Sequence, residues 1–587
     1  MPGAHPPRSR RPPRSAASTL DRLAALRGER GPEAARAKRK EIARLEKERL
    51  RRPEEIAALH DLLLFFRALP EDARIVAACE RALARFARRP DLLRFAGELA
   101  GSGIEGTATP YPFFYPTALW LARRYPGRLT IDWRRFDDPE EMAPLVAAIV
   151  APEERAWLQA SAPGARATLA ALAGRRRTDA EELLERLAAL PGDDFTRESL
   201  HDATQPWYVL AAGANGASRT RGRAPGSPLL CRALPLDRRR PELAEEWRRP
   251  AAQAWRLSPA AARPLLDLAR EAMATRARDL DAFAYGDPRD AWRVRQADGL
   301  EFVAFGSLPE RRLSLATVYG LLTLRNGVPA GYAQIDGFLA TALVHFNTFE
   351  TFRGADAAWV FARLLATTRT LLGARAFAIE PYQLGRDNDE AIESGAWWFY
   401  AKLGFAPRDA AIARRAAAER RRFARDPRAR SSSETLRLLA ERHLFWEPDG
   451  RPAMLPPHAE VARASVAVVA ERAGAALAAG RRALVAEAAE LVELGGKTRL
   501  SAAERFWLER WAPMIHALPG VASWSIEDRR GLGRLLRAKA GRRESDFLPL
   551  ARAHPRFGPA LLELARRANE LDASGLSPSG VRRRSPE

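Results

Sequence analysis

A short segment near the middle of this chain has the residue types that bind phosphate. An apolar stretch ending at Phe349 is followed by Arg353 and Gly354, and a run with helical periodicity begins at Ala357. A glycine-bearing turn between a strand and a helix exposes backbone N–H groups at the positive end of the helix dipole, where anions bind favourably. The segment therefore predicts a site for a phosphorylated cofactor.

The elements that must position this segment follow one another in a regular order. Strands are expected over 301–305, 318–324, 330–335, 342–349 and 374–379, and Asn326-Gly327 between the second and third is a strong hairpin signal. Helical periodicity covers 357–371 and 391–403, and Gly404 is a natural end for the second helix. The glycine-bearing turn thus lies between the fourth expected strand and the helix that follows it.

This order of elements and two short motifs resemble the acetyl-CoA-dependent N-acetyltransferase (GNAT) superfamily, over roughly 150 of the 587 residues. The first family motif, Arg/Gln-x-x-Gly-x-Gly/Ala between a strand and a helix, is similar to the run Arg353-Gly354-Ala355-Asp356-Ala357-Ala358. The second, Tyr-x-x-Leu-Gly-Phe at the end of a helix, is similar to Tyr400-Ala401-Lys402-Leu403-Gly404-Phe405. The resemblance implies a mixed sheet with a splayed centre.

The resemblance also implies a cofactor and residues that hold it. In the family the loop amides bind the CoA pyrophosphate, which assigns acetyl-CoA or another acyl-CoA to Arg353, Gly354, Ala355, Asp356, Ala357 and Ala358. Asp356 stands where the family has its central glycine, and a carboxylate beside a pyrophosphate costs about 1 kcal/mol even when well solvated.

The tyrosine of the second motif often acts in the family as the acid that protonates the departing CoA thiolate. Here that role falls to Tyr400, and a phenol of pKa about 10 is suited to a thiolate of similar basicity. A tyrosine buried in the protein core explains the same residue, so both interpretations of Tyr400 stay open.

Three residues are candidates for the base that deprotonates the acceptor. The family often places a glutamate on the strand before the loop, and here that strand offers His345 and, near its end, Glu350. Glu380, at the end of the next strand, is the third. Strand alternation puts His345 and Glu350 on opposite faces, which leaves the choice open. The polar segment 380–390 either favours a cationic amine beside the sheet or is an ordinary solvated loop.

The composition points weakly to nucleic acid. The net charge is +22 and the pI about 10.9, values typical of nucleic-acid partners. Only six of the 95 basic residues are lysines, however, and the arginines are spread along the whole chain. Because binding surfaces concentrate charge, a dispersed compositional bias is the favoured explanation, and no motif supports a nucleic-acid partner.

The cysteines and the hydropathy exclude several classes of protein. Cys79 and Cys231 lie far apart, and neither has a second cysteine or a histidine at ligand spacing, which excludes a disulfide framework and a cysteine-based zinc site. No run approaches the roughly 18 apolar residues that span a bilayer, so no membrane partner is expected. We expect no metal and a reducing, cytoplasmic location.

We predict an α+β protein with a central GNAT-like mixed sheet between two all-α domains. The expected parts are a basic tail (1–18), a helical N-terminal domain (19–250), the GNAT-like domain (251–410), a helical C-terminal domain (411–575) and a frayed tail (576–587).

The leading functional hypothesis is acyl transfer, most simply of acetyl, from acyl-CoA to a small-molecule or peptide amine. Two alternatives are an aminoacyl-tRNA-dependent transferase on a GNAT-like fold and a non-catalytic binding or scaffold protein. Arginines clustered beside the cleft would favour the tRNA-dependent transferase. An occluded cofactor cleft would favour the non-catalytic protein.

Overall fold

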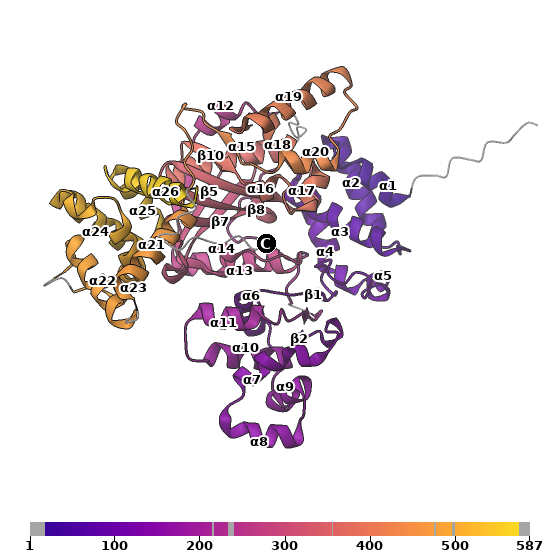
Figure 1. Cartoon of the computed structure of the whole chain (residues 1–587). Coiled ribbons are helices and arrows are strands. Elements are labelled where there is room, and N and C mark those ends of the chain that lie inside the picture. Colours follow the sequence, from indigo (N-terminus) through magenta and orange to yellow (C-terminus); the bar gives the residue numbers. More distant parts are fainter. Residues whose placement is uncertain are drawn as a thin grey trace, which may run out of the picture.

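A nine-stranded mixed sheet lies at the centre of the computed structural model, which describes residues 18–213, 216–232, 240–354, 356–474, 477–495 and 499–573 (Figure 1). The strand order is β11-β12-β10-β9-β8-β7-β6-β5-β4. All neighbours pair antiparallel except β9 and β10, which are parallel. The strands are β4 (Gln253–Arg256), β5 (Gly286–Arg295), β6 (Leu300–Ser307), β7 (Thr317–Arg325), β8 (Val328–Phe338), β9 (Thr341–Thr348), β10 (Ala376–Ile379), β11 (Ala406–Pro407) and β12 (Leu444–Trp446).

The central strands form where their sequence patterns predict. Asn326 and Gly327 connect β7 to β8 with φ angles of +48° and +80°, and only a few residue types adopt two such angles in succession. Every residue of β6 is buried, because helices cover both faces of the sheet. Phe302 contributes to the core on one face, and Val303 to the core on the other.

Two sets of helices cover this sheet (Figure 1). α15 and α12 pack together on one face, whereas α13 and α14 contact β5, β6 and β7 on the other. The helices of this part of the chain are α12 (Leu243–Arg248), α13 (Pro259–Ala274), α14 (Asp281–Ala284), α15 (Ala357–Leu372), α16 (Pro381–Leu384), α17 (Asp389–Ser394), α18 (Ala396–Lys402), α19 (Ala410–Arg425) and α20 (Ser433–Leu439).

The N-terminal helices pack against the turn that follows β9. The Phe65 ring stacks on Phe352 with centroids 6.2 Å apart, and the Thr351 hydroxyl donates a hydrogen bond of 2.9 Å to Asp61. Asn326 also donates to the Ala68 carbonyl over 2.8 Å. These helices are α1 (Thr19–Ala25), α2 (Pro32–Leu45), α3 (Pro53–Ala68), α4 (Ala73–Ala84) and α5 (Pro90–Arg94).

A second N-terminal unit differs from the all-helical domain that we expected. It has its own hydrophobic core and a three-stranded antiparallel sheet in the order β1-β3-β2. Each strand has three residues, too few for an alternating pattern to stand out in the sequence. The unit comprises β1 (Thr109–Tyr111), α6 (Tyr115–Arg124), β2 (Leu129–Ile131), α7 (Ala143–Ile149), α8 (Pro152–Ser161), α9 (Ala165–Ala173), α10 (Asp179–Ala189), α11 (Asp194–Asp202) and β3 (Tyr208–Leu210).

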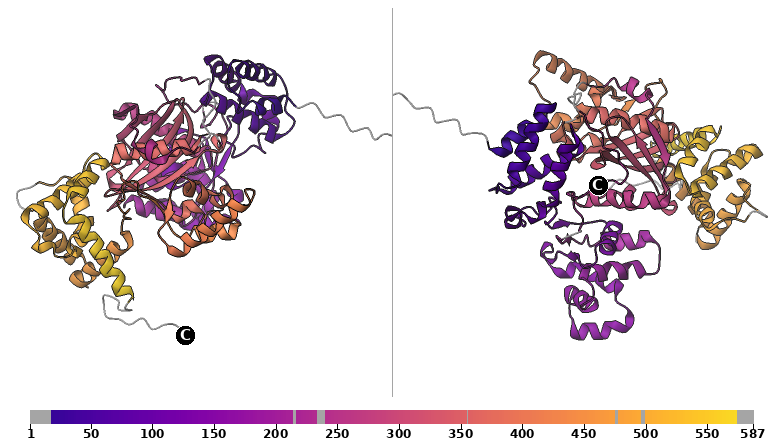
Figure 2. Two further views of the ribbon diagram at one scale, coloured as in Figure 1. Left: turned by 90° about the horizontal axis from the view of Figure 1, so that it is seen from above. Right: turned by 180° about the vertical axis from the view of Figure 1, so that it is seen from behind.

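The C-terminal helices lie at the opposite end of the sheet from α1–α5 (Figure 2). They are α21 (His458–Ala473), α22 (Leu477–Leu491), α23 (Ala502–Ala517), α24 (Ile526–Ala540), α25 (Phe547–Ala553) and α26 (Phe557–Ala573). No described helix is long and apolar enough to cross a membrane. Apart from Ser18, the tails expected at 1–18 and 576–587 lie outside the described residues.

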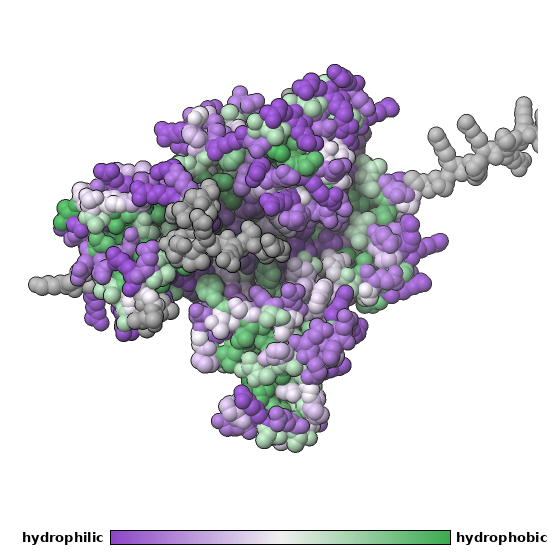
Figure 3. Space-filling model, viewed as in Figure 1, coloured by the Kyte–Doolittle hydropathy of each residue, from purple (hydrophilic) through white to green (hydrophobic). Residues whose placement is uncertain are grey.

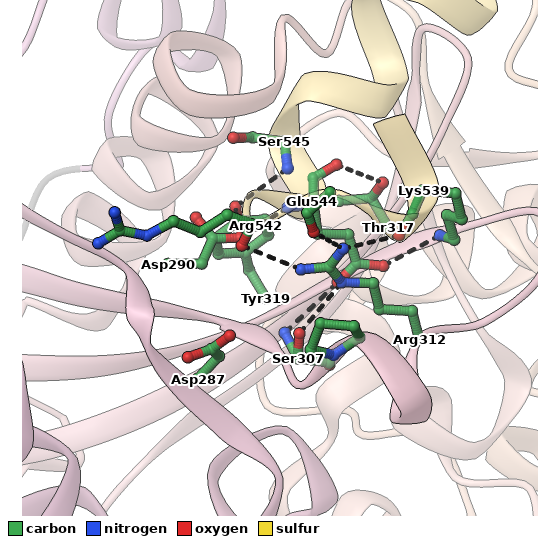
Figure 4. Close-up of polar contacts among 12 residues, drawn as sticks. Asp287, Asp290, Ser307, Arg312, Thr317, Tyr319, Lys539, Arg542, Glu544 and Ser545 are labelled. Carbon is green, nitrogen blue, oxygen red and sulfur yellow. Dashed lines mark hydrogen bonds and ion pairs between the residues drawn. The ribbon is translucent and has the colours of Figure 1, made fainter. Parts of the chain in front are cut away.

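A buried polar network joins the C-terminal helices to the sheet (Figure 4). The Arg312 guanidinium donates to the carbonyls of Lys539, over 2.7 Å, and Gly541. The Lys539 ammonium lies 3.1 Å from Glu544, whose backbone N–H donates to Asp290 of β5 over 2.8 Å. Because these side chains are almost completely buried, the network fixes the domain on the sheet without taking part in any accessible site.

Candidate functional site

The centre of the sheet opens between the two parallel strands. β9 pairs with β10 only through Thr341, Ala342 and Leu343, then continues to Thr348, whereas β10 ends at Ile379. Beyond Leu343, β9 therefore has no paired strand on this side among the described residues. The connection between the two strands runs through α15, and its N-terminus lies just after this opening.

Three polar side chains meet where the strands part. His345 of β9 directly faces Gln334 of β8, and Asp336 lies two residues further along the same face. The His345 Nδ1 is 2.9 Å from the Glu380 carboxylate, and its Nε2 is 3.5 Å from that of Asp336. Gln334 donates a hydrogen bond of 3.0 Å to Asp336 and holds that carboxylate in place.

The two carboxylates control the charge of His345. Burial lowers the pKa of the ring, but Asp336 and Glu380 outweigh burial, and the pKa rises from 6.5 to about 9. The residue is therefore an imidazolium at neutral pH. In that form it can donate a proton, and it accepts one as a base only after it has been deprotonated.

A glycine with positive φ precedes α15 in the segment where we expected phosphate to bind, and the aspartate of that segment is neutralised. Gly354 is exposed with φ of +74°, and Ala355 lies outside the described residues. The Asp356 carboxylate forms an ion pair with Arg325, whose side chain is only 3% exposed. Asp356 precedes α15 without capping it through its side chain. Since its charge is directed at Arg325, it does not compete with an anion for the helix amides.

On the side of the loop that faces Arg325, there is little free space. A cavity of about 20 Å³ lies between Arg325, Asp356 and Ala357, enough for a single water molecule. On the other side, the loop is open: Arg353 is exposed and pairs with Glu390 of α17, and Ala358 is half-buried. A phosphate would therefore contact the loop from its exposed side.

Tyr400 belongs to an aromatic cluster. Its ring is 3% exposed and packs on Phe361 at 5.3 Å and on Phe399 at 5.1 Å between centroids. Burial raises the pKa of the phenol well above its usual range, and its hydroxyl makes no hydrogen bond to any described residue. Phe361 in turn contacts Phe346 of β9, so the cluster reaches the strand that carries His345.

The third candidate base lies apart from the other two. Glu350 is exposed and lines a larger cavity with Arg219, Arg276 and Arg278. The structure thus brings His345 and Glu380 together and places Glu350 elsewhere. Asp336 was missed in the sequence, although Gln334 and Asp336 at alternate positions of a strand mark a polar face. The three arginines come from two separate segments, Arg219 from one and Arg276 and Arg278 from the other, and carry no local signal.

Neither a metal site nor a similarity to known proteins assigns a function to these residues. Within the part of the chain that the structure describes, no group of three or more His, Cys, Asp or Glu side chains could hold a metal ion. Comparison of the chain with protein-family models, curated proteins and solved structures gave no match.

Proposed function

We propose that the central domain is a GNAT-like acyltransferase that moves an acyl group, most simply acetyl, from acyl-CoA to an amine. The observation that carries the proposal is the opening between β9 and β10 with Asp336, His345 and Glu380 beside it. The single parallel pair, the α15 connection and the glycine-bearing loop before α15 support the same fold. A cytoplasmic location, with Cys79 and Cys231 unpaired, belongs to the proposal.

The residues at the opening suit attack of an amine on a thioester. Asp336 and Glu380 attract a cationic amine, and the base is Glu380 or the deprotonated form of His345, whereas Glu350 lines a separate cavity. Backbone N–H groups of β9 beyond Leu343 can stabilise the oxyanion. As the C–S bond breaks, His345 or Tyr400 donates the proton that the thiolate takes up.

The test of the proposal is acyl-CoA binding through the loop. Acetyl-CoA at about 100 times its dissociation constant should add about 2.7 kcal/mol to the unfolding free energy. Gly354→Val should abolish this gain, because a side chain there blocks the approach of phosphate to the backbone. Gly450→Val is the matched control, since Gly450 is also exposed, has φ of +66° and has no atom within 4 Å of an added Cβ.

Two results would overturn the proposal. One is the absence of any acetyl-CoA effect on the wild type, and the other is equal stabilisation of the Gly354→Val and Gly450→Val variants. A loss of stability common to both variants reflects the strain of a valine at positive φ and is subtracted by the comparison.

A second candidate function is transfer of an aminoacyl group from charged tRNA. It is favoured by α19 and the segment after it, residues 410–430. This stretch contains eight arginines and only two acidic residues, Glu419 and Asp426. All eight arginines are exposed. A concentrated basic surface of this kind suits a phosphate backbone.

This candidate predicts that tRNA binds and that its affinity falls steeply with salt. Changing Arg420, Arg421 and Arg422 to glutamine should reduce the slope of log affinity against log salt by about two to three. An unchanged slope would exclude α19 from the contact.

A further inference from the structure

A cavity of about 270 Å³ lies at the end of β9, where the sheet meets the segment after α13 and the start of α17. Figure 3 shows the surface hollowed between α17 and α13, with hydrophilic residues along much of the recess. The charged residues that line the cavity are Arg219, Arg276, Arg278, Arg353, Glu350 and Glu390. Four guanidinium groups thus converge from three segments that are far apart in the sequence, because Arg276 and Arg278 share one segment.

The carboxylates near the cavity do not balance this charge. Arg278 donates two hydrogen bonds of 3.0 Å to Glu390, and Arg353 pairs with the same carboxylate. Arg219 lies 3.0 Å from Asp61. One carboxylate therefore serves two guanidinium groups, and Glu350 forms no ion pair with any described residue.

Arg276 is the least satisfied of the four arginines. Its guanidinium lies over the Phe349 ring, 3.8 Å from the centroid, and donates one hydrogen bond, over 2.8 Å, to the Ala272 carbonyl. Its Nε is buried without a partner, as is that of Arg219. Among the described residues no carboxylate lies within 4.0 Å of Arg276. A guanidinium has five N–H donors, so most of its hydrogen-bonding capacity is unused.

The position of Arg276 is unfavourable unless an anion binds there. Burial, together with the positive charge of Arg219, lowers its pKa to about 9. A buried charge that is neither paired nor hydrogen-bonded is costly. A phosphate group has several acceptor oxygens and a negative charge, and it fits a cavity of this volume.

The cavity is connected to the opening of the sheet through β9. Asn347 lines the cavity and lies on the same face of β9 as His345, two residues or roughly 7 Å away. A molecule with a phosphate in the cavity can therefore place its other end beside Asp336, His345 and Glu380, whose carboxylates attract an ammonium group.

We propose that this cavity binds the phosphate of the acceptor, which is a phosphorylated amine. The phosphate site stands on the arginine cluster and the cavity alone, whereas the identity of the ligand as the acceptor rests on the proposed acyl transfer. The site adjoins the loop before α15, which that proposal gives to acyl-CoA, and Arg353 belongs to both.

Inorganic pyrophosphate is the probe for the cavity. It should raise the melting temperature of the full chain above that in chloride at equal ionic strength, and Arg276→Met should weaken its binding at least tenfold. Arg408→Met is the matched control, because Arg408 also lies over a phenylalanine ring, Phe445, at 4.0 Å but does not line the cavity. It should bind pyrophosphate as the wild type does.

If Arg276 had a purely structural role, Arg276→Met without ligand would melt at a lower temperature than the wild type. If Arg276 serves the ligand rather than the fold, Arg276→Met without ligand should melt at the same or a higher temperature than the wild type. Arg219→Gln, which removes the second unsatisfied guanidinium, should weaken pyrophosphate binding as well. Wild-type affinity in both variants, or no effect of pyrophosphate on the wild type, overturns the phosphate site.

Acetyl-CoA separates this inference from the proposed function. Arg276→Met should leave the stabilisation by acetyl-CoA unchanged, because Arg276 lines the cavity and does not belong to the loop before α15. Loss of the acetyl-CoA effect in Arg276→Met would give the cavity to the donor and overturn the acceptor assignment. If pyrophosphate binds through Arg276 while acetyl-CoA does not bind at all, the phosphate site stands and the acyltransferase proposal falls.

Discussion

His345 shows how a side chain's chemistry depends on residues that are distant in the sequence. The sequence placed it on the strand before the loop as one of three candidate bases. Its charge, however, is set by Asp336 on the neighbouring strand and by Glu380 after the next one. Strand periodicity predicts which face His345 occupies, but not which residues of other strands lie opposite.

The raised pKa of His345 predicts a pH-dependent stability. Below pH 6.5 both the folded and the unfolded states hold the proton, and the stabilisation is complete. As the pH rises from 6.5 to about 9, it is lost, because only the folded state retains the proton. The loss should be about 3 kcal/mol in unfolding free energy. Urea unfolding between pH 6 and 10 should show it in the wild type and not in His345→Gln.

The same pKa constrains catalysis. If neutral His345 is the base, log kcat/KM should rise with a slope of one up to about pH 9. A rate that is constant from pH 6 to 9 would instead assign the base to Glu380.

Tyr400→Phe distinguishes the acid from a core residue. The hydroxyl makes no hydrogen bond to a described residue, so its removal should change the unfolding free energy by less than about 1 kcal/mol. A general acid should lose about 10²–10⁴ in kcat with little change in acetyl-CoA affinity. Turnover within about threefold of the wild type would leave Tyr400 as part of the aromatic cluster with Phe361 and Phe399.

At the scale of elements, local sequence patterns predicted individual strands and helices, but they did not predict which strands pair with one another. The hairpin at Asn326-Gly327, the strand before the loop and α15 follow from turn chemistry and periodicity. The small strand β12, by contrast, lies beyond residue 410, where we expected the sheet domain to end, yet it pairs with β10. Its three residues join the sheet through a long-range contact that no local signal reveals.

The ion pair between Asp356 and Arg325 gives a prediction for the start of α15. Asp356→Asn should lower the unfolding free energy by about 3 kcal/mol, because it leaves a buried guanidinium without its partner. It should also tighten acetyl-CoA binding, since the positive charge of Arg325 is then no longer cancelled next to the loop. Asp387→Asn, at a position that is 89% exposed, should change neither by much. Weaker binding by Asp356→Asn would show that the carboxylate supports the loop.

At the scale of the whole molecule, the helical units surround the sheet but contact the region around the opening between β9 and β10 unequally. The N-terminal helices contact the turn that leads into the loop, through Asp61 and Phe65, and Arg219 from the following segment lines the arginine cavity. The C-terminal helices instead join the sheet through the network around Glu544 (Figure 4). The sequence predicted helical regions, but the positions of these units depend on hydrogen bonds between residues more than 200 positions apart, such as that from the Arg312 guanidinium to the Lys539 carbonyl.

The Lys539–Glu544 pair tests how firmly the C-terminal helices are held. Glu544→Leu should lower the unfolding free energy by about 3–5 kcal/mol, because it leaves Lys539 and Arg312 buried without a counter-charge. Lys539→Met should be costly for the same reason, whereas the double variant should recover part of the loss, since it removes both charges of the pair. Denaturant unfolding of the four proteins gives the coupling energy. Strictly additive single losses would show that the two residues stabilise the domain independently, and that Arg312 with its carbonyl partners is the principal link to the sheet.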